Sequence, residues 1–281
     1  MTPSATSFAC RAARPGFGQR ACGCAGFTIL EVLVVLGTMV LLASLLLPGL
    51  AQAREQAKAA VCGSNVKQIM LANSLYAEDF SGIYCPGASD FLRNLDRWHG
   101  HREHADKPFE SSHGPLVDYL GPEGAVRQCP TFASAEIGLE HGGFERGNGG
   151  YGYNNAFIGT QTRRGDAGAY SVSNDRAGVP VVRVARPSAT IMFTDAAFAA
   201  DALIEYSFAE PRFHPGFPTA RADPSIHFRH RDRATVGWVD GHVDRPRRTF
   251  TYHSGFYPTD PQRFHLGWFG QADDNSLFDL R

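Results

Sequence analysis

Apolar residues gather in one long segment near the amino end of the chain. From Phe27 to Leu50, 17 of 24 residues are Ala, Val, Ile, Leu, Met or Phe. A helix of this length rises roughly 36 Å, which exceeds the ~30 Å hydrocarbon core of a bilayer. The pattern therefore predicts a transmembrane helix over residues 27–50. Glu31 lies inside it, where a carboxylate costs on the order of 2.5–3.5 kcal/mol, so we expect this residue to be functional and to have a binding partner.

The apolar segment continues into an amphipathic one over residues 51–82. Six residues recur at steps of three and four and form one mostly apolar stripe: Cys62, Val66, Ile69, Asn73, Tyr76 and Phe80. Charged residues such as Arg54, Glu55 and Lys67 lie off this stripe. Gly82 supplies a stop, because glycine is favoured just past a helix end. We expect one continuous helix from residue 27 to about 80, with the stripe of its second half packed on a sheet.

Residues 83–281 predict a globular domain of short strands and long loops. The segments 189–195 and 234–238 predict strands, and the Asp240-Gly241 pair between strand-like runs predicts a hairpin. Residues 85–190 contain few periodic segments, and no strand is assigned there. The 30 Gly and 17 Pro favour turns over further long helices. The predicted class is α+β, with a long amino-terminal helix packed on an antiparallel sheet.

The residues just before the apolar segment carry a family resemblance. Residues 26–31 read Gly-Phe-Thr-Ile-Leu-Glu, and this G-F-T-x-x-E motif before an apolar helix resembles the processing site of type IV pilins and type II secretion pseudopilins. The resemblance implies that a prepilin peptidase cleaves between Gly26 and Phe27 and methylates the new amino group. It also implies that Glu31 neutralises the terminal amine of a neighbouring subunit in a filament. Pro48 matches the helix-kinking proline that many of these proteins carry.

Two other interpretations of residues 1–53 are an ordinary secretory signal, cleaved after Ala53, and a plain membrane anchor. The apolar stretch is longer than the ~7–15 residues of a signal h-region and contains Glu31, which favours pilin-type processing. Residues 1–26 hold three arginines and no acidic residue, so the amino end is expected in the cytoplasm. This orientation predicts a single-pass protein of the inner membrane with an exported globular domain.

The carboxyl end extends the resemblance. His230, nine intervening residues and Asp240-Gly241 match an H-x9-D-G pattern, which is found in a large pilin-like group with the same amino-terminal motif. Further segments of this chain that are similar to that group are Ala53–Ala57, Cys62–Ile69, Cys129-Pro130, Tyr151–Asn154 and Asp195-Ala196. The likeness therefore touches both ends of the chain and several points between them.

The roles of these polar residues stay open at this point. In the structural interpretation Asp240 makes the hairpin turn, and His230 bonds a carboxylate or a backbone group. The alternative is a metal site built from Asp195, His230 and Asp240, with His242 as a fourth ligand. Some pseudopilins need calcium, but histidine favours a transition metal. Residues 273–275, Asp-Asp-Asn, form a second candidate for calcium or simply a solvated loop.

One motif would fit an enzyme. His99, His101 and His104, with Glu103, have the H-x-H-x-[D/E]-H spacing of binuclear metallohydrolases. That motif should follow a buried apolar strand, whereas residues 91–98 predict an amphipathic segment or a loop. The favoured interpretation is a solvated histidine-rich loop, and a secreted metallohydrolase is the alternative.

Three of the six cysteines lie in the leader, so Cys62, Cys85 and Cys129 reach the oxidising exterior. One disulfide and one free thiol are expected. The pair Cys62–Cys129 would tie the sheet to the helix, Cys85–Cys129 is the second choice, and a three-cysteine zinc site is a further alternative.

The charge does not favour nucleic acid as a partner. The chain carries a formal net charge of −1, and loss of the three leader arginines leaves 24 − 28 = −4. We expect a non-enzymatic subunit with no resident cofactor that assembles into a type II secretion pseudopilus or, alternatively, a type IV pilus. The expected partners are the prepilin peptidase, other pilin-like subunits and an inner-membrane assembly platform. The expected segments are 1–26, 27–50, 51–82 and 83–281.

Overall fold

The computed structural model describes residues 28–121, 125–133, 145–165 and 168–281. Its longest element is helix α1, Ile29–Asp79. The chain divides into two compact units, residues 1–49 and residues 50–281, so the second half of α1 belongs with the globular domain. The α+β class is confirmed at this level: one long helix with an apolar first half precedes a domain with antiparallel sheets.

Helix α1 begins and ends close to the predicted positions. Its first half is exposed and is long and apolar enough to cross a membrane, and Pro48 lies inside the helix. At the other end Ser81 and Gly82 take left-handed φ angles of 56° and 77°. The Gly82 N–H then donates to the Ala77 carbonyl at 2.7 Å, which closes the last turn.

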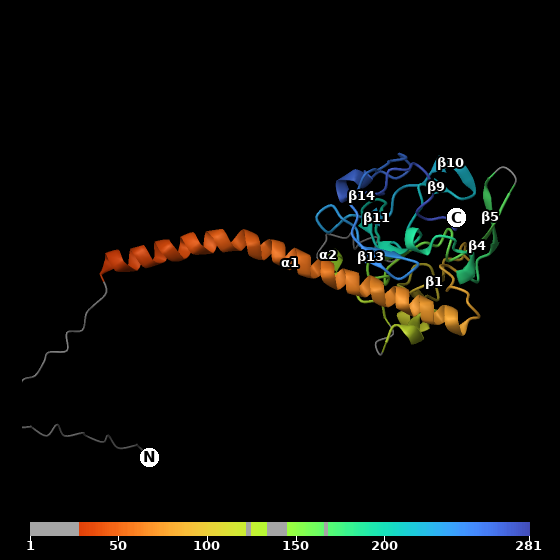
Figure 1. Ribbon diagram of the computed structural model, residues 1–281, viewed down its shortest axis with the longest axis horizontal. Helices are drawn as coiled ribbons and strands as arrows, with labels where there is room; N and C mark the ends of the chain where they lie inside the picture. The colour runs from red at the N-terminus through yellow and green to blue at the C-terminus, as the bar shows by residue number, and fades with distance from the viewer. Residues whose placement is uncertain (1–27, 122–124, 134–144, 166–167) are drawn as a thin grey trace, which may run out of the picture. The chain divides into compact units, whose positions relative to one another are not determined.

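The second half of α1 buries one face against the globular domain (Figure 1). Cys62, Val66, Ile69 and Asn73 are buried, as the periodicity predicts. The stripe ends one turn early: Tyr76 is half-buried, and Phe80 is 51% exposed, so its predicted place in the core is wrong. Phe80 lies beyond the last helical residue, and its ring stacks on Tyr76 with centroids 4.1 Å apart.

A four-stranded antiparallel sheet forms the centre of the domain. Its order is β13-β12-β6-β3. The strands are β3 (Tyr151–Tyr153), β6 (Ile191–Asp195), β12 (Val236–Trp238) and β13 (Val243–Asp244). The two predicted strands are thus the central pair, β6 and β12, and the predicted Asp-Gly hairpin joins β12 to β13.

The other elements are short. Five two-stranded ribbons, β1-β2, β4-β5, β7-β8, β10-β9 and β11-β14, accompany the sheet in the described part of the chain. Their strands are β1 (Asp96–Arg97), β2 (Gly100–His101), β4 (Gln161–Arg164), β5 (Tyr170–Asn174), β7 (Phe198–Ala199), β8 (Leu203–Ile204), β9 (Phe213–His214), β10 (Phe217–Arg221), β11 (Ile226–His227) and β14 (Leu266–Gly267). Helix α2 covers Pro130–Ala133, and 3-10 turns are η1 (Ser111–His113), η2 (Val117–Tyr119), η4 (Val181–Arg183), η5 (Pro187–Ala189) and η6 (Pro261–Phe264).

Helix and sheet are held in register by close packing and by two buried hydrogen bonds. Gly237 of β12 faces the helix, and a Cβ added there would lie 2.7 Å from a methyl carbon of Val66, so only glycine allows this approach. Asn65 donates to the Tyr151 hydroxyl at 3.0 Å. Asn73 donates to the Tyr153 hydroxyl at the same distance. These contacts fix the segment of α1 from Asn65 to Asn73, about two turns, against the sheet. Cys62 lies just before this segment, and its sulfur is part of the candidate site near Asp195 at the end of β6.

Candidate functional site

The candidate site is centred on a buried disulfide. Cys62 of α1 and Cys129, the residue before α2, are bonded to each other with Cα atoms 5.3 Å apart, and both are fully buried. This is the pair that we expected from the sequence. Cys85 is the free cysteine of the described chain and is also buried. Burial raises the pKa of the Cys85 thiol, which keeps it protonated and unreactive.

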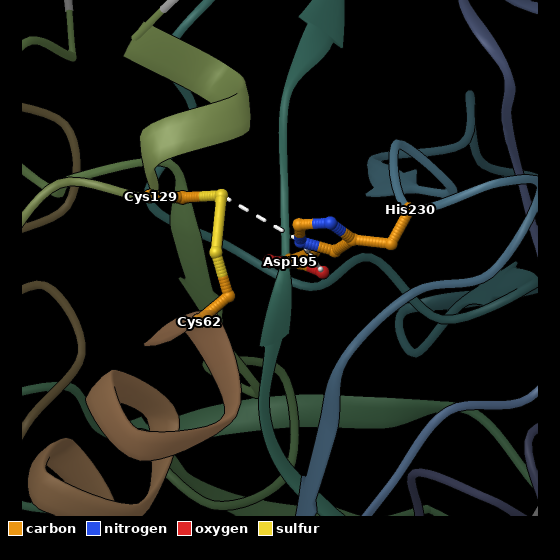
Figure 2. Close-up of side chains that lie close together, drawn as sticks. All are labelled: Cys62, Cys129, Asp195 and His230. Carbon is orange, nitrogen blue, oxygen red and sulfur yellow. Dashed lines mark hydrogen bonds and ion pairs between the residues drawn. A yellow bond between two sulfur atoms is a disulfide. The ribbon is translucent and has the colours of Figure 1, made fainter. Parts of the chain in front are cut away.

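Two motif residues, His230 and Asp195, lie beside this disulfide (Figure 2). The Nε2 atom of His230 lies 3.6 Å from the Cys129 sulfur and 3.5 Å from Oδ2 of Asp195. Asp195 is the last residue of β6, and its Oδ2 accepts a hydrogen bond of 2.7 Å from the Thr235 N–H. Residues separated by up to 168 positions in sequence therefore meet at one point, which combines the Cys, Cys-Pro, Asp-Ala and His motifs.

Arg229 balances the buried carboxylate. Its Nε lies 3.8 Å from Oδ1 of Asp195, and its Nη2 donates to the carbonyls of Gly150 and Ala196 at 2.6 and 2.9 Å. The guanidinium also stacks 4.4 Å over the ring of Phe132. Desolvation lowers the pKa of His230, more than Asp195 raises it. The imidazole is therefore neutral at pH 7, and the Asp195–Arg229 pair has no net charge.

Within the described chain, one group of side chains has the residue types and spacing of a metal site. The ligand atoms of Cys62, Cys129, Asp195 and His230 lie within 4.8 Å of one another. A soft metal such as zinc would need two thiolates here. The sulfurs are instead bonded to each other, which leaves only one imidazole and one carboxylate as ligands. In the disulfide form this arrangement is a structural cross-link beside a buried ion pair.

The alternative metal site of Asp195, His230, Asp240 and His242 does not form a single cluster, whereas His230 contacts a carboxylate, as the structural interpretation predicts. Asp240 and His242 lie in the β12–β13 turn, where Oδ1 of Asp240 accepts from the His242 N–H at 3.1 Å and contacts Nδ1 at 2.6 Å. Gly241 has φ 88° and its carbonyl accepts from Lys67 of α1. The Asp-Gly pair turns the chain and bonds the helix, because an Asp-Gly hairpin turn carries these residues away from the end of β6.

The three histidines of the hydrolase-like motif separate. His99 is buried, its Nε2 lies 2.8 Å from the Ser207 hydroxyl, and desolvation lowers its pKa to about 3. His101 is half-buried and bonds Asp96 at 2.7 Å, whereas His104 is exposed. The expectation of one solvated loop is thus wrong for His99. Because His99 is buried against Ser207 while His101 bonds Asp96 and His104 is exposed, the motif forms no metal-ligand group in the described residues.

In the acidic loop near the carboxyl end, Asp273 forms ion pairs with two arginines. Asp273 bonds Arg221 through two contacts of 2.8 Å and Arg212 at 3.3 Å. These guanidinium groups lower its pKa to about 2. Asp274 accepts from the Ser276 N–H at 2.9 Å. The oxygens proposed for calcium are therefore already engaged by arginines and by the backbone.

The processing residues Gly26 and Phe27 lie outside the described residues. Glu31 is in the first turn of α1, and its Oε2 accepts from the N–H and the hydroxyl of Thr28 at 2.8 and 2.9 Å. The Glu31 N–H donates back to the Thr28 hydroxyl at 3.2 Å. This reciprocal pairing is a capping box, which directs the carboxylate toward the amino end of the helix.

Sequence reasoning missed the arginines around His230. Arg229 neutralises Asp195, and further arginines at 231, 233, 245 and 247 line a cavity beside His230. The signal was present as two Arg-rich runs, residues 229–233 and 245–248, one on each side of the β12–β13 hairpin. Comparisons with protein-family models, curated proteins and solved structures give no match to this chain.

Proposed function

We propose that this chain is a pilin-like subunit that assembles into a type II secretion pseudopilus. In this proposal a prepilin peptidase removes residues 1–26 and methylates Phe27, and the apolar half of α1 then anchors the subunit in the inner membrane. The same half packs with other subunits in the filament, which stands on an inner-membrane platform. The G-F-T-x-x-E motif and the H-x9-D-G pattern support the family assignment.

The proposal rests mainly on the different environments of the two halves of α1. One helix begins with an exposed apolar half and ends with a half that is fixed to the domain by a disulfide, by Asn65 and by Asn73. In the proposed filament the apolar half packs with neighbouring subunits, while the disulfide and the two hydrogen bonds keep the second half of α1 on the globular domain.

Glu31 would form the charged contact between neighbouring subunits in this proposal. Among the described residues of one chain, the Glu31 carboxylate accepts hydrogen bonds from the N–H and the hydroxyl of Thr28, which are neutral donors. In a filament the terminal amine of a neighbouring Phe27 would add a positive partner near the same oxygens. Two charges that are each costly in lipid become tolerable as a pair, and the pair fixes the register between subunits.

The test is incorporation of Glu31→Val into filaments in a bacterial host with a prepilin peptidase. Glu78→Val is the matched control, because Glu78 is an exposed glutamate in the globular half of α1. We expect Glu31→Val to insert into the membrane but to be absent from sheared filament fractions, and Glu78→Val to assemble. Normal assembly of Glu31→Val would refute the proposed pairing.

A further inference from the structure

A strongly basic cavity opens beside the candidate site. Its volume is about 550 Å³, and one wall is formed by the first turns of α1 in the globular unit, including Glu55. The cavity is also lined by His230, Arg231, Arg233, Arg245 and Arg247. This volume lies within the ~300–1,000 Å³ range of sites that bind small molecules.

The cavity concentrates positive charge in a chain whose formal net charge is −1. Four arginines face one acid, Glu55, and that acid already pairs with Lys58 at 2.9 Å. Arg231, Arg245 and Arg247 are exposed, and within the described part of the chain none of them forms an ion pair with a carboxylate. The local net charge of 4 − 1 = +3 contrasts with −1 for the whole chain. An anion is therefore the expected occupant.

The turn that carries Arg231 and Arg233 contains two unfavourable backbone conformations. Arg231 and Asp232 are both left-handed, with φ of 56° and 59°, although neither is glycine. The His230 N–H closes the turn by donating to the Arg233 carbonyl at 3.0 Å. The carboxylate of Asp232 faces Arg248 at 3.5 Å and so does not neutralise the cavity. Such unfavourable φ angles persist where the surrounding structure requires them, often at binding sites.

The cavity also lies close to the end of the apolar segment. That segment ends at Leu50, and Glu55 follows five residues later in the same helix. The helical rise between them is roughly 8 Å. This is about one Debye length at physiological ionic strength, so charges at this height act strongly on a membrane surface. Glu55, which lines the cavity, thus lies within about one Debye length of the residue at which the apolar segment ends.

We propose that this cavity binds the phosphate headgroup of an anionic phospholipid in the leaflet from which α1 emerges. Guanidinium groups match phosphate oxygens in paired hydrogen bonds. Several arginines around one cavity also favour a headgroup with a net negative charge over a zwitterionic one, because they repel the ammonium group of the latter. Bound lipid would fix the height and rotation of the domain above the membrane before assembly. The inference rests on the membrane-spanning part of the proposed function and not on cleavage or filament formation.

The test uses the full chain in a neutral detergent. Native mass spectrometry measures binding of phosphatidylglycerol, phosphatidylcholine and inorganic phosphate to the protein and to two double variants. Arg245→Gln/Arg247→Gln removes two cavity charges. Arg163→Gln/Arg183→Gln removes two exposed charges elsewhere in the domain and is the matched control. Circular dichroism and an intact Cys62–Cys129 disulfide verify that each variant is folded.

We expect phosphatidylglycerol to bind at least tenfold more tightly than phosphatidylcholine. The cavity variant should lose about 10- to 30-fold in phosphatidylglycerol affinity, since each arginine near a lipid surface contributes roughly a factor of five, and the control should lose less than twofold. Equal losses in both variants, no preference for phosphatidylglycerol, or displacement of the lipid by equimolar inorganic phosphate would each overturn the assignment. Glu31→Val should bind lipid normally, which separates this test from the assembly test.

Discussion

Removal of the Cys62–Cys129 disulfide should strongly destabilise the globular domain. The bond closes a loop with a sequence separation of 67 residues. The chain-entropy relation for a loop of that length gives about 4.4 kcal/mol of stabilisation at 25 °C, because the cross-link restricts the unfolded chain. For a domain of this size, each kcal/mol shifts the melting temperature by about 2–4 °C. Cys62→Ala/Cys129→Ala should therefore lower it by roughly 9–18 °C.

The assay is thermal unfolding of the full mature chain in detergent, followed by near-ultraviolet circular dichroism. Cys85→Ala is the control, because it removes a buried sulfur without breaking a disulfide. Reduction of the native protein provides a second comparison that leaves all side chains in place. The denatured mature protein should titrate a single free thiol. Three free thiols, or a double variant no less stable than Cys85→Ala, would refute the reasoning.

Two further predictions follow from buried groups. The pKa of His99 is about 3 in the fold and about 6.5 when unfolded, so only the unfolded state binds this proton between those values. Stability should thus fall as pH drops below 6.5, by up to about 1.4 kcal/mol per pH unit. In urea titrations at several pH values, His99→Gln should reduce the slope of the free energy of unfolding against pH, whereas His104→Gln, at an exposed position, should leave it unchanged. Equal slopes in the two variants would contradict this. Gly237→Ala should lower the free energy of unfolding by about 1–3 kcal/mol, because the added methyl group would clash with α1. Gly63→Ala has open space around it and should raise the free energy of unfolding by about 0.5–1 kcal/mol. A change of the same sign in both variants would argue against the helix–sheet packing.

Local signals in the sequence predict the long elements of this fold. The apolar run, its amphipathic continuation and Gly82 define α1 almost to the residue, and Asp240-Gly241 predicts the β12–β13 hairpin. The strands between residues 85 and 190 could not be predicted in the same way. β1 and β2 have two residues each and β3 has three, which is too short to establish a period of two. The longer strands β4 and β5, with four and five residues, are largely exposed and lack a buried apolar face.

The candidate site depends on contacts between distant segments. The position of Cys62 on the buried stripe of the helix predicts its place in the disulfide. That Asp195 and His230 would reach the same point, and Asp240 would not, follows from the strand order, which the sequence does not reveal. His99 is similar: its burial against Ser207 requires a segment more than a hundred residues away.

The amino terminus of the mature protein tests the central proposal most directly. The chain should be expressed in a bacterial host with an active prepilin peptidase, isolated from the membrane and analysed by mass spectrometry of its amino-terminal peptide. The account predicts a chain that begins with methylated Phe27. A chain that begins at Arg54 would indicate a conventional secretory signal, and one that retains Met1 would indicate a plain anchor; either result would contradict the account.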